Sequence, residues 1–281
     1  AIPDRSVSEK GIGPDLQAAA LAVSSDGFQE SVYPWRIRFE TAAQLEDSPG
    51  TDGRIELTAE QAVILPLSVI EQDPSLISRY GDQLMAELPA MLWPGMGAKV
   101  LQSLKNLKRL GLARAYVDNI GAVEIARSAG LFIHGGFCLN LLNSVTVDEY
   151  RALGLTDSVL SMELSYANLR RLSPSMPVGT VVYGRMPLMK LRACPARGEK
   201  GCGSCDGHPV LTDRMGEQFP MLCRSRQYSE ILNCVPQYTA DKGLPANCFK
   251  LVYFTVETAA QCRAILKNCK EKRSPAFRRT A

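Results

Sequence analysis

The 281-residue sequence has no apolar run long enough to cross a bilayer, and no secretory leader is recognisable at its start. Its longest early apolar run, around residues 18–23, lacks a basic flank and is far shorter than the roughly 20 residues of a membrane span. We therefore expect no membrane association and a cytoplasmic location. In that reducing compartment, the nine cysteines indicate metal or redox chemistry rather than disulfides.

The sequence also lacks the common nucleotide-binding loops. No Gly-x-Gly-x-x-Gly follows a predicted strand, and Gly-x-x-x-x-Gly-Lys-Ser/Thr does not occur. The net charge of +3 is too small to indicate a polyanionic partner for the whole molecule. These absences argue against nucleotide binding of the Rossmann or P-loop type.

Histidine is scarce, because His134 and His208 are the only two in the chain. A serine or cysteine protease needs a base beside its nucleophile, and a zinc protease typically uses His-Glu-x-x-His, which is absent. Cys138 follows His134 by four residues, a spacing that could form a dyad on a helix. We expect His134 to end a strand before two glycines, so the sequence gives peptidase chemistry little support.

Short apolar runs separated by helical segments are present along most of the chain, and they predict repeated β-α units. We expect an α/β fold with a (β/α) barrel-like domain and a Cys-rich metal-binding insert near the C-terminus. The predicted divisions are an N-terminal arm at 1–35, the barrel-like domain at 36–189, the insert at 190–249, and a final strand, helix and basic tail at 250–281. The strands should begin near Arg36, Ala62, Pro89, Ala115, Leu131, Ser158, Thr180 and Leu251.

Helix signals separate these strands. Apolar residues recur at intervals of three and four from Val100 to Leu110, and Gly111 provides a C-terminal stop. Thr146 and Glu149 have the spacing of a capping box, and Ser165 is a suitable N-cap for a helix over 166–172. A last helix is expected from about residue 257 to 269.

The insert contains a dense group of cysteines: Cys194, Cys202, Cys205 and Cys223. A Cys-x-x-Cys turn lets two sulfurs reach one ion, and two further thiolates complete a tetrahedral zinc site or hold an iron–sulfur cluster. A redox pair of Cys202 and Cys205, or His208 in place of one thiolate, remains an alternative. The other thiols, Cys138, Cys248, Cys262 and Cys269, are expected to be buried packing residues.

The insert is rich in glycine and poor in large apolar side chains. Burial alone should not offset the cost of ordering such a segment, which is about 1–2 kcal/mol per residue. A structural metal can supply the difference. We therefore expect the insert, but not the barrel, to depend on its metal.

Functional groups of a barrel lie at the C-terminal ends of its strands. This rule selects Glu40, Asp118, Asn119, His134, Asn140, Glu163 and Arg185 as candidates for one mouth. No catalytic role can be assigned from the sequence, and Asn140, Glu163 and Arg185 are the main candidates. Glu163 and Arg185 could instead form an ion pair that orders the loops.

Several short segments resemble the signature of the bacterial collagenase-like proteins, peptidase family U32. They are Tyr183-Gly-Arg-Met-Pro-Leu-Met189 before Cys194, and Leu211-Thr-Asp-Arg-Met-Gly-Glu-Gln-Phe-Pro220 before Cys223. Asn140-Leu-Leu-Asn143 and Ser161-Met-Glu-Leu-Ser165 resemble two further family segments. The resemblance is strongest to the C-terminal half of a long member, which implies the N-terminal half of the same longer polypeptide as a partner.

The resemblance implies a function similar to that of the oxygen-independent hydroxylation factors, some of which modify RNA. It assigns Cys194, Cys202, Cys205 and Cys223 as ligands of a 4Fe–4S cluster or zinc, and RNA as a possible partner. Met162 stands where the short members have an arginine, which argues against an anionic substrate for this half. The alternatives are a peptidase, as the family name states, and a non-catalytic structural domain with a zinc site made of four cysteines.

Overall fold

The computed structural model describes residues 33–45, 55, 57–197, 202, 203, 205, 207–224, 227–245 and 248–274. The expected N-terminal arm therefore lies outside the described residues up to position 32. The expected basic tail lies outside them from position 275 onward.

Eight parallel strands close into a barrel, which confirms the predicted barrel-like α/β fold. The main sheet has nine strands in the order β12-β7-β13-β1-β2-β3-β4-β5-β6, and β6 also pairs with β7. Removing antiparallel β12 (Gln237–Tyr238) leaves the eight that form the ring. They are β1 (Trp35–Arg38), β2 (Gln61–Pro66), β3 (Leu84–Glu87), β4 (Arg114–Val117), β5 (Phe132–Gly135), β6 (Leu155–Val159), β7 (Val178–Gly184) and β13 (Phe249–Tyr253).

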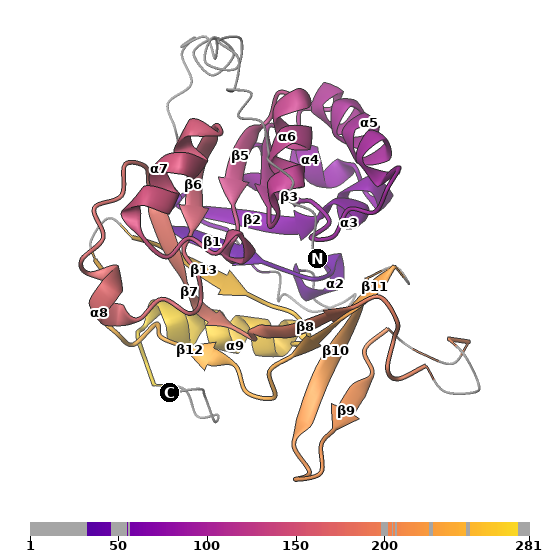
Figure 1. Ribbon diagram of the computed structural model, residues 1–281, viewed down its shortest axis with the longest axis vertical. Coiled ribbons are helices and arrows are strands. Elements are labelled where there is room, and N and C mark those ends of the chain that lie inside the picture. Colours follow the sequence, from indigo (N-terminus) through magenta and orange to yellow (C-terminus); the bar gives the residue numbers. More distant parts are fainter. Residues whose placement is uncertain are drawn as a thin grey trace, which may run out of the picture.

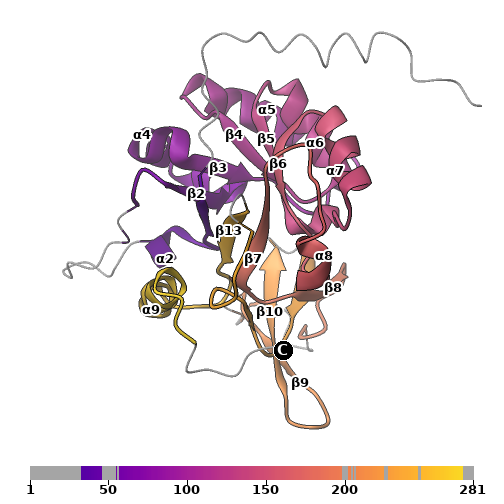
Figure 2. The ribbon, with the colours of Figure 1, turned by 90° about the vertical axis from the view of Figure 1, so that its left-hand side faces the viewer.

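Helices cover the outside of the barrel (Figures 1 and 2). The apolar residues of each strand that point outward, such as Val63 and Leu65 of β2, pack in one large core with the helices. The helices are α2 (Ala42–Leu45), α3 (Leu67–Gln72), α4 (Ser75–Tyr80), α5 (Met96–Arg109), α6 (Ile120–Ser128), α7 (Ser144–Ala152), α8 (Tyr166–Leu169) and α9 (Ala259–Lys270), with 3-10 turns at Gly81–Gln83 and Phe137–Leu139. None of these described helices has the length and apolar character needed to span a bilayer.

Two details of the sequence interpretation were wrong. The third strand is Leu84–Glu87, and the expected strand at Pro89–Trp93 is instead the loop that follows it. The capping box of α7 starts at Asn143, whose side chain accepts the N–H of Thr146, so the helix begins one turn earlier than expected. The true strand is shorter and less apolar than Pro89–Trp93, and the true N-cap is Asn143 and not Thr146.

The barrel interior is unusually polar. On β1, Arg36 and Arg38 point inward and are fully buried, whereas barrels are typically filled by branched apolar side chains. Arg36 donates two hydrogen bonds to Asp157, at 2.6 and 2.5 Å. His134 Nδ1 lies 2.9 Å from the same carboxylate, and Arg114 lies 3.2 Å from His134 Nε2. We call Arg36, Arg114, His134 and Asp157 the inner network.

Four of the described strands between β7 and β13 form a second sheet. Its antiparallel strands are in the order β8-β11-β10-β9, namely β8 (Pro187–Leu191), β11 (Tyr228–Leu232), β10 (Gln218–Arg224) and β9 (Val210–Thr212). We call this the insert sheet. Figure 1 shows it beside the barrel, with the β9–β10 hairpin projecting away from the body of the molecule. Met221, Leu222 and Leu232 are buried, so the insert contributes some apolar burial of its own.

Candidate active site at the barrel mouth

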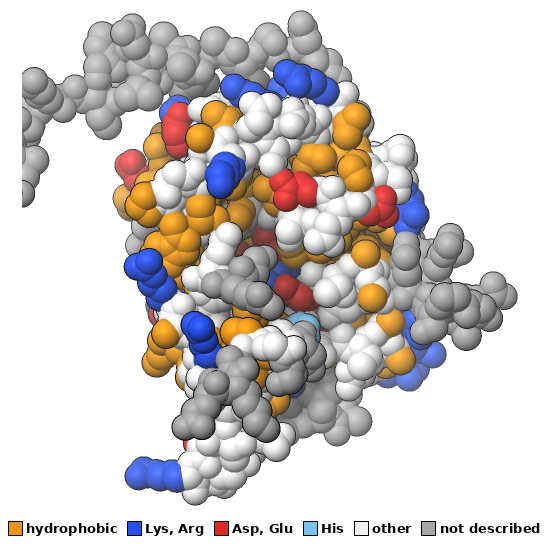
Figure 3. Space-filling model, turned by 90° about the vertical axis from the view of Figure 1, so that its right-hand side faces the viewer, with side chains coloured by type: hydrophobic (Ala, Val, Ile, Leu, Met, Phe, Trp, Pro, Cys, Tyr) orange, Lys and Arg blue, Asp and Glu red, His pale blue; other side chains and the backbone are white. Residues whose placement is uncertain are grey.

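A cavity of about 420 Å³ lies between the C-terminal end of the barrel and the insert sheet. Strand ends supply Glu40, Glu87, Asp118, Cys138 and Tyr253 from the barrel, and the insert sheet closes the other side. Acidic side chains lie in and around the hollow on the face shown in Figure 3. The cavity thus occupies the position where barrel enzymes carry their active sites. We call it the mouth cavity.

The pairing register of the insert sheet determines which of its side chains face the barrel. Lys190 of β8 lies opposite Glu230 of β11, and Tyr228 lies opposite Arg224 of β10. Directly opposed residues share a face, and alternate residues along β11 share it too, so all four side chains are on one face. All four line the mouth cavity. The insert sheet therefore presents a charged inner face to the barrel.

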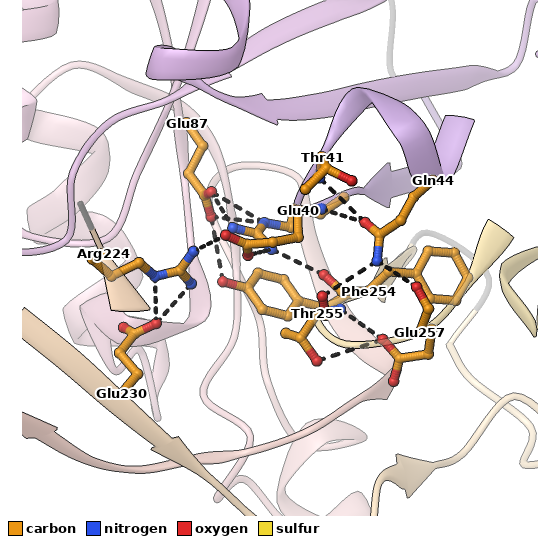
Figure 4. A network of polar contacts seen from close by, with 11 residues as sticks. Glu40, Thr41, Gln44, Glu87, Arg224, Glu230, Phe254, Thr255 and Glu257 are labelled. Carbon is orange, nitrogen blue, oxygen red and sulfur yellow. Dashed lines mark hydrogen bonds and ion pairs between the residues drawn. The ribbon is translucent and has the colours of Figure 1, made fainter. Parts of the chain in front are cut away.

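Alternating charges connect the barrel to this face (Figure 4). Arg38 pairs with Glu40, and Glu40 also pairs with Arg224 of the insert sheet. Arg224 in turn binds Glu230 at 2.7 Å, and Glu230 lies 3.6 Å from Lys190. We call these five residues the charge chain. Because each carboxylate has a cationic partner, the chain holds the insert sheet over the mouth.

Glu87 is also neutralised by a neighbour. Arg38 donates to both of its carboxylate oxygens, the shortest contact being 2.5 Å, and the Tyr253 hydroxyl donates at 3.3 Å. Arg38 thus forms ion pairs with both Glu40 and Glu87. Burial by itself would lower the pKa of Arg38, but these carboxylates outweigh it and raise the pKa further above its usual value.

Asp118 differs from the other carboxylates of the mouth cavity. It follows β4 and accepts the backbone N–H of Cys138 at 3.1 Å. Burial, reinforced by the charge of Glu87, raises the pKa of Asp118 to about 6, although Lys190 acts in the opposite direction. Gly136 permits this position, because a Cβ there would lie 2.0 Å from the Asp118 carboxylate. Asp118 can therefore gain and lose a proton near neutral pH.

Lys190 and Cys138 meet next to Asp118, with Nζ and Sγ 3.8 Å apart. Burial raises the pKa of the Cys138 thiol, and the charge of Asp118 raises it further, so the thiol stays protonated. Burial alone would lower the pKa of Lys190, but the neighbouring carboxylates of Glu230 and Asp118 raise it, so the ammonium group stays charged. The site therefore combines a titrating carboxyl group with a fixed cation.

The mouth candidates from the sequence do not all line the mouth cavity. Asp118 and Glu40 line the mouth cavity as expected. Asn119 instead caps α6 and donates to the carbonyls of Pro89 and Ala90, which is a structural role. His134 belongs to the inner network, deeper in the barrel, where burial lowers its pKa despite the neighbouring Asp157.

Asn140, Glu163 and Arg185 are not gathered at one point. Asn140 and Glu163 line a second cavity of about 350 Å³ beside the first. Arg185 donates to the carbonyls of Asn233 and Cys234 at 3.0 and 2.6 Å, and it lies 3.8 Å from Glu257. Among the ion pairs of the described residues, Arg185 is paired with Glu257 and not with Glu163.

The four predicted metal ligands lie in the insert. Cys223 is on β10, and its N–H donates to the carbonyl of Gly207 at 3.0 Å. The same glycine donates its N–H to Cys205 Sγ at 3.4 Å. Cys194 follows β8, and Cys202 is half-buried. Within the described part of the chain, no three His, Cys, Asp or Glu side chains are arranged to hold a metal ion. The four-cysteine site remains a prediction.

Sequence reasoning missed Cys138, Lys190, Arg224 and Glu230 as site residues. Cys138 was expected to be a packing residue, yet it lines both cavities. The strand-end rule could have selected it, because it follows β5 by three residues. Lys190 and Glu230 could be found only by pairing two strands that are forty residues apart in sequence.

Residues 71–198 match the sequence profile of peptidase family U32, which confirms the family inferred from the motifs. The match includes Asp118, Cys138 and Lys190, but Cys194 is the only one of the four predicted ligands within it. No curated protein and no solved structure matches the chain.

Proposed function

Because this chain contains a domain of peptidase family U32, we propose that it is an enzyme whose reaction takes place in the mouth cavity. Asp118 transfers a proton, and Lys190 stabilises negative charge on the substrate. The observation that carries this proposal is the position of Asp118, which is buried at the mouth cavity and has no arginine among its described hydrogen bonds and ion pairs. Burial there raises its pKa to about 6. Glu40, Glu87 and Glu230 line the same cavity, but each already forms an ion pair with an arginine.

The chain's own residues support a simple sequence of events. The N–H of Cys138 fixes one oxygen of Asp118, so the second oxygen is available to a substrate proton. Ionised Asp118 accepts that proton from an N–H, O–H or activated C–H group. Lys190 then lies beside the charge that develops, in a cavity where the low dielectric strengthens its effect. The charge chain keeps Lys190 in place during both steps.

We propose that the substrate is RNA, the possible partner that the family resemblance implies, and that one uncharged base of it enters the mouth cavity. A volume of about 420 Å³ lies in the usual range for small-molecule sites. Leu88, Pro89, Tyr228 and Tyr253 supply apolar and aromatic walls. Enzymes that act on bases typically hold an extruded base between such side chains.

The metal forms a separate part of the proposal. Cys194, Cys202, Cys205 and Cys223 would hold a 4Fe–4S cluster or zinc, because four thiolates are the usual donors for either. A 4Fe–4S cluster would be able to accept or donate electrons, whereas a closed zinc site would only fold the insert. The described side chains do not converge as a metal group, so no step proposed above passes through the metal.

Peptidase chemistry has weaker support. The thiol of Cys138 has a raised pKa, and the described residues that line the mouth cavity include no histidine to deprotonate it. His134 binds Asp157 inside the barrel. The proposal therefore favours base modification over peptide hydrolysis.

The test compares cellular RNA from a strain that lacks the gene with RNA from strains complemented by variants. Nucleoside mass spectrometry should show one modified nucleoside that is lost in the deletion strain and restored by the wild-type gene. Asp118→Asn and Lys190→Met should fail to restore it. Glu71→Gln, a change to an exposed carboxylate at the cavity rim, should restore it. An unchanged nucleoside profile in the deletion strain would rule out an RNA target.

A further inference from the structure

The second cavity adjoins the mouth cavity directly. Cys138, Pro187 and Lys190 line both, so these side chains form the boundary between the two cavities. At this boundary Lys190 Nζ lies 3.8 Å from Cys138 Sγ. Phe137 of the second cavity packs edge-on against Tyr253 of the first, with ring centroids 5.1 Å apart. A ligand with two neighbouring rings could therefore occupy both cavities at once.

The walls of the second cavity are apolar and polarisable. Met162, Met186 and Met189 line it, and Met189 is 52% exposed although it is a large apolar side chain. Leu188 beside it is 48% exposed. Methionine sulfur makes favourable contacts with aromatic rings, often at the ring edge. Such a surface suits a planar heterocycle better than a sugar.

Two polar side chains give the second cavity a hydrogen-bonding edge. Asn140 has an exposed side chain and ends the 3-10 turn Phe137–Leu139 with a left-handed backbone at φ 58°. Glu163 is exposed and contributes a carboxylate. Lys190, at the boundary with the mouth cavity, is the one cation among the described residues that line this cavity. This charge pattern disfavours a phosphate and favours a ring edge that donates hydrogen bonds.

We propose that the second cavity is a binding site for a guanine base, which lies next to the base processed in the mouth cavity. The Watson–Crick edge of guanine offers two parallel N–H donors, which match the two oxygens of Glu163. Its adjacent carbonyl matches the amide N–H of Asn140. Methionines cover the ring face. The inference deepens the proposed function and rests on it for the identity of the neighbouring base, but the guanine site itself can be tested alone.

The direct test is an NMR titration of the whole chain with guanosine and with inosine, which lacks the 2-amino group. Guanosine should bind about tenfold more tightly, because inosine leaves one oxygen of Glu163 without its donor. Glu163→Gln should remove this preference. Glu149→Gln, which changes an exposed carboxylate on α7 outside the cavity, should retain it. Equal affinity for the two nucleosides in the wild type, or an unchanged preference in Glu163→Gln, would overturn the proposal.

Two further variants locate the bound nucleoside. Met189→Trp should fill the second cavity and abolish guanosine binding, whereas Ser103→Trp, at the mouth cavity, should not. The opposite result would place guanosine in the mouth cavity and overturn the assignment. The complementation experiment with Asp118→Asn separates the two proposals. If Asp118→Asn still restores the RNA modification while Glu163→Gln loses its preference, the proposed function fails and the guanine site stands.

Discussion

Two buried aspartates of the same barrel have opposite properties. Asp157 belongs to the inner network, where burial alone would raise its pKa, but Arg36 and His134 hold the pKa well below its usual range. Asp118 lies at the mouth, where no arginine contact offsets burial among the described hydrogen bonds and ion pairs, and its pKa rises to about 6. Burial is common to both, so the partner decides whether a carboxylate is structural or reactive.

The inner network and the barrel mouth differ in the same way as their two aspartates. The inner network is enclosed by the strands, and Arg36 stacks on Phe249 at 3.7 Å from the ring centroid. Around the mouth, the charge chain pairs Glu40 and Glu230 with cations. Asp118 lines the cavity and does not belong to the chain. The inner network thus maintains the barrel, while the mouth keeps one acidic group available for chemistry.

The largest expected effect comes from breaking the inner network. Asp157→Asn leaves Arg36 buried without its anion, so the free energy of unfolding at pH 7 should fall by about 3–5 kcal/mol. Urea denaturation measures this, with Asp148→Asn on the exposed side of α7 as the control. A loss below about 1 kcal/mol would show that the network does not stabilise the fold. Because the pKa of Asp157 is lowered by folding, its stabilisation should be present above about pH 4 and decline below it.

The contribution of Asp118 to stability is expected to depend on pH with the opposite sign to that of Asp157. The folded pKa of Asp118, about 6, exceeds its ordinary value of 3.8, so its contribution to stability decreases as the pH rises through this interval. A shift of about two units corresponds to about 3 kcal/mol. Asp118→Asn should therefore gain up to about 3 kcal/mol over wild type at about pH 8, and little of this at about pH 4.5. A pH-independent difference in urea denaturation would contradict this expectation.

A smaller effect should follow from releasing the insert sheet. Arg224→Met removes the cation shared by Glu40 and Glu230, and loss of such charged hydrogen bonds costs about 1.5–3 kcal/mol. Hydrogen exchange should increase in β10 and β11 and remain slow in the barrel strands. Lys99→Met, at the rim of the mouth cavity, serves as the control. Uniformly faster exchange would mean that the charge chain stabilises the whole barrel.

The smallest effect on the barrel should come from the predicted metal ligands. Cys202→Ser with Cys205→Ser should abolish metal binding and make the insert sensitive to protease, with little change in far-UV circular dichroism. Elemental analysis and absorbance near 400 nm of anaerobically prepared protein distinguish zinc from an iron–sulfur cluster. A double mutant with Cys248→Ser and Cys262→Ser tests thiols outside the cysteine group for comparison. If the proteolysis pattern of the Cys202 and Cys205 variant equals that of wild type, these cysteines do not hold the insert together.

The fold was predictable from the sequence to a large extent, because each β-α unit carries its own local signals. The strand that was misplaced, Leu84–Glu87, is four residues long and ends in an inward-facing glutamate, whereas Pro89–Trp93 is more apolar. The alternation of Arg36 and Arg38 with apolar residues indicated a strand correctly. It could not indicate that the charged face points into the barrel, because that depends on Asp157, 121 residues away from Arg36.

The site was only partly predictable for the same reason. Asp118 was selected by its position after a strand, but its raised pKa depends on burial and on Glu87. Lys190 reaches Cys138 only because the insert sheet folds over the mouth. These long-range contacts leave no local pattern. The cysteine group was the opposite case, since its spacing is a strong local signal but the described side chains do not converge.

The contrast between the two aspartates is most directly tested by titrating both in the folded protein. Carbon-detected NMR of the aspartate carboxyl groups measures both, with Asp118→Asn used to assign the Asp118 signal. We predict a midpoint near pH 6 for Asp118 and an Asp157 signal that does not titrate down to the pH at which the fold is lost. A midpoint for Asp118 at or below its ordinary value of 3.8 would contradict the assignment of the mouth cavity as the reactive region.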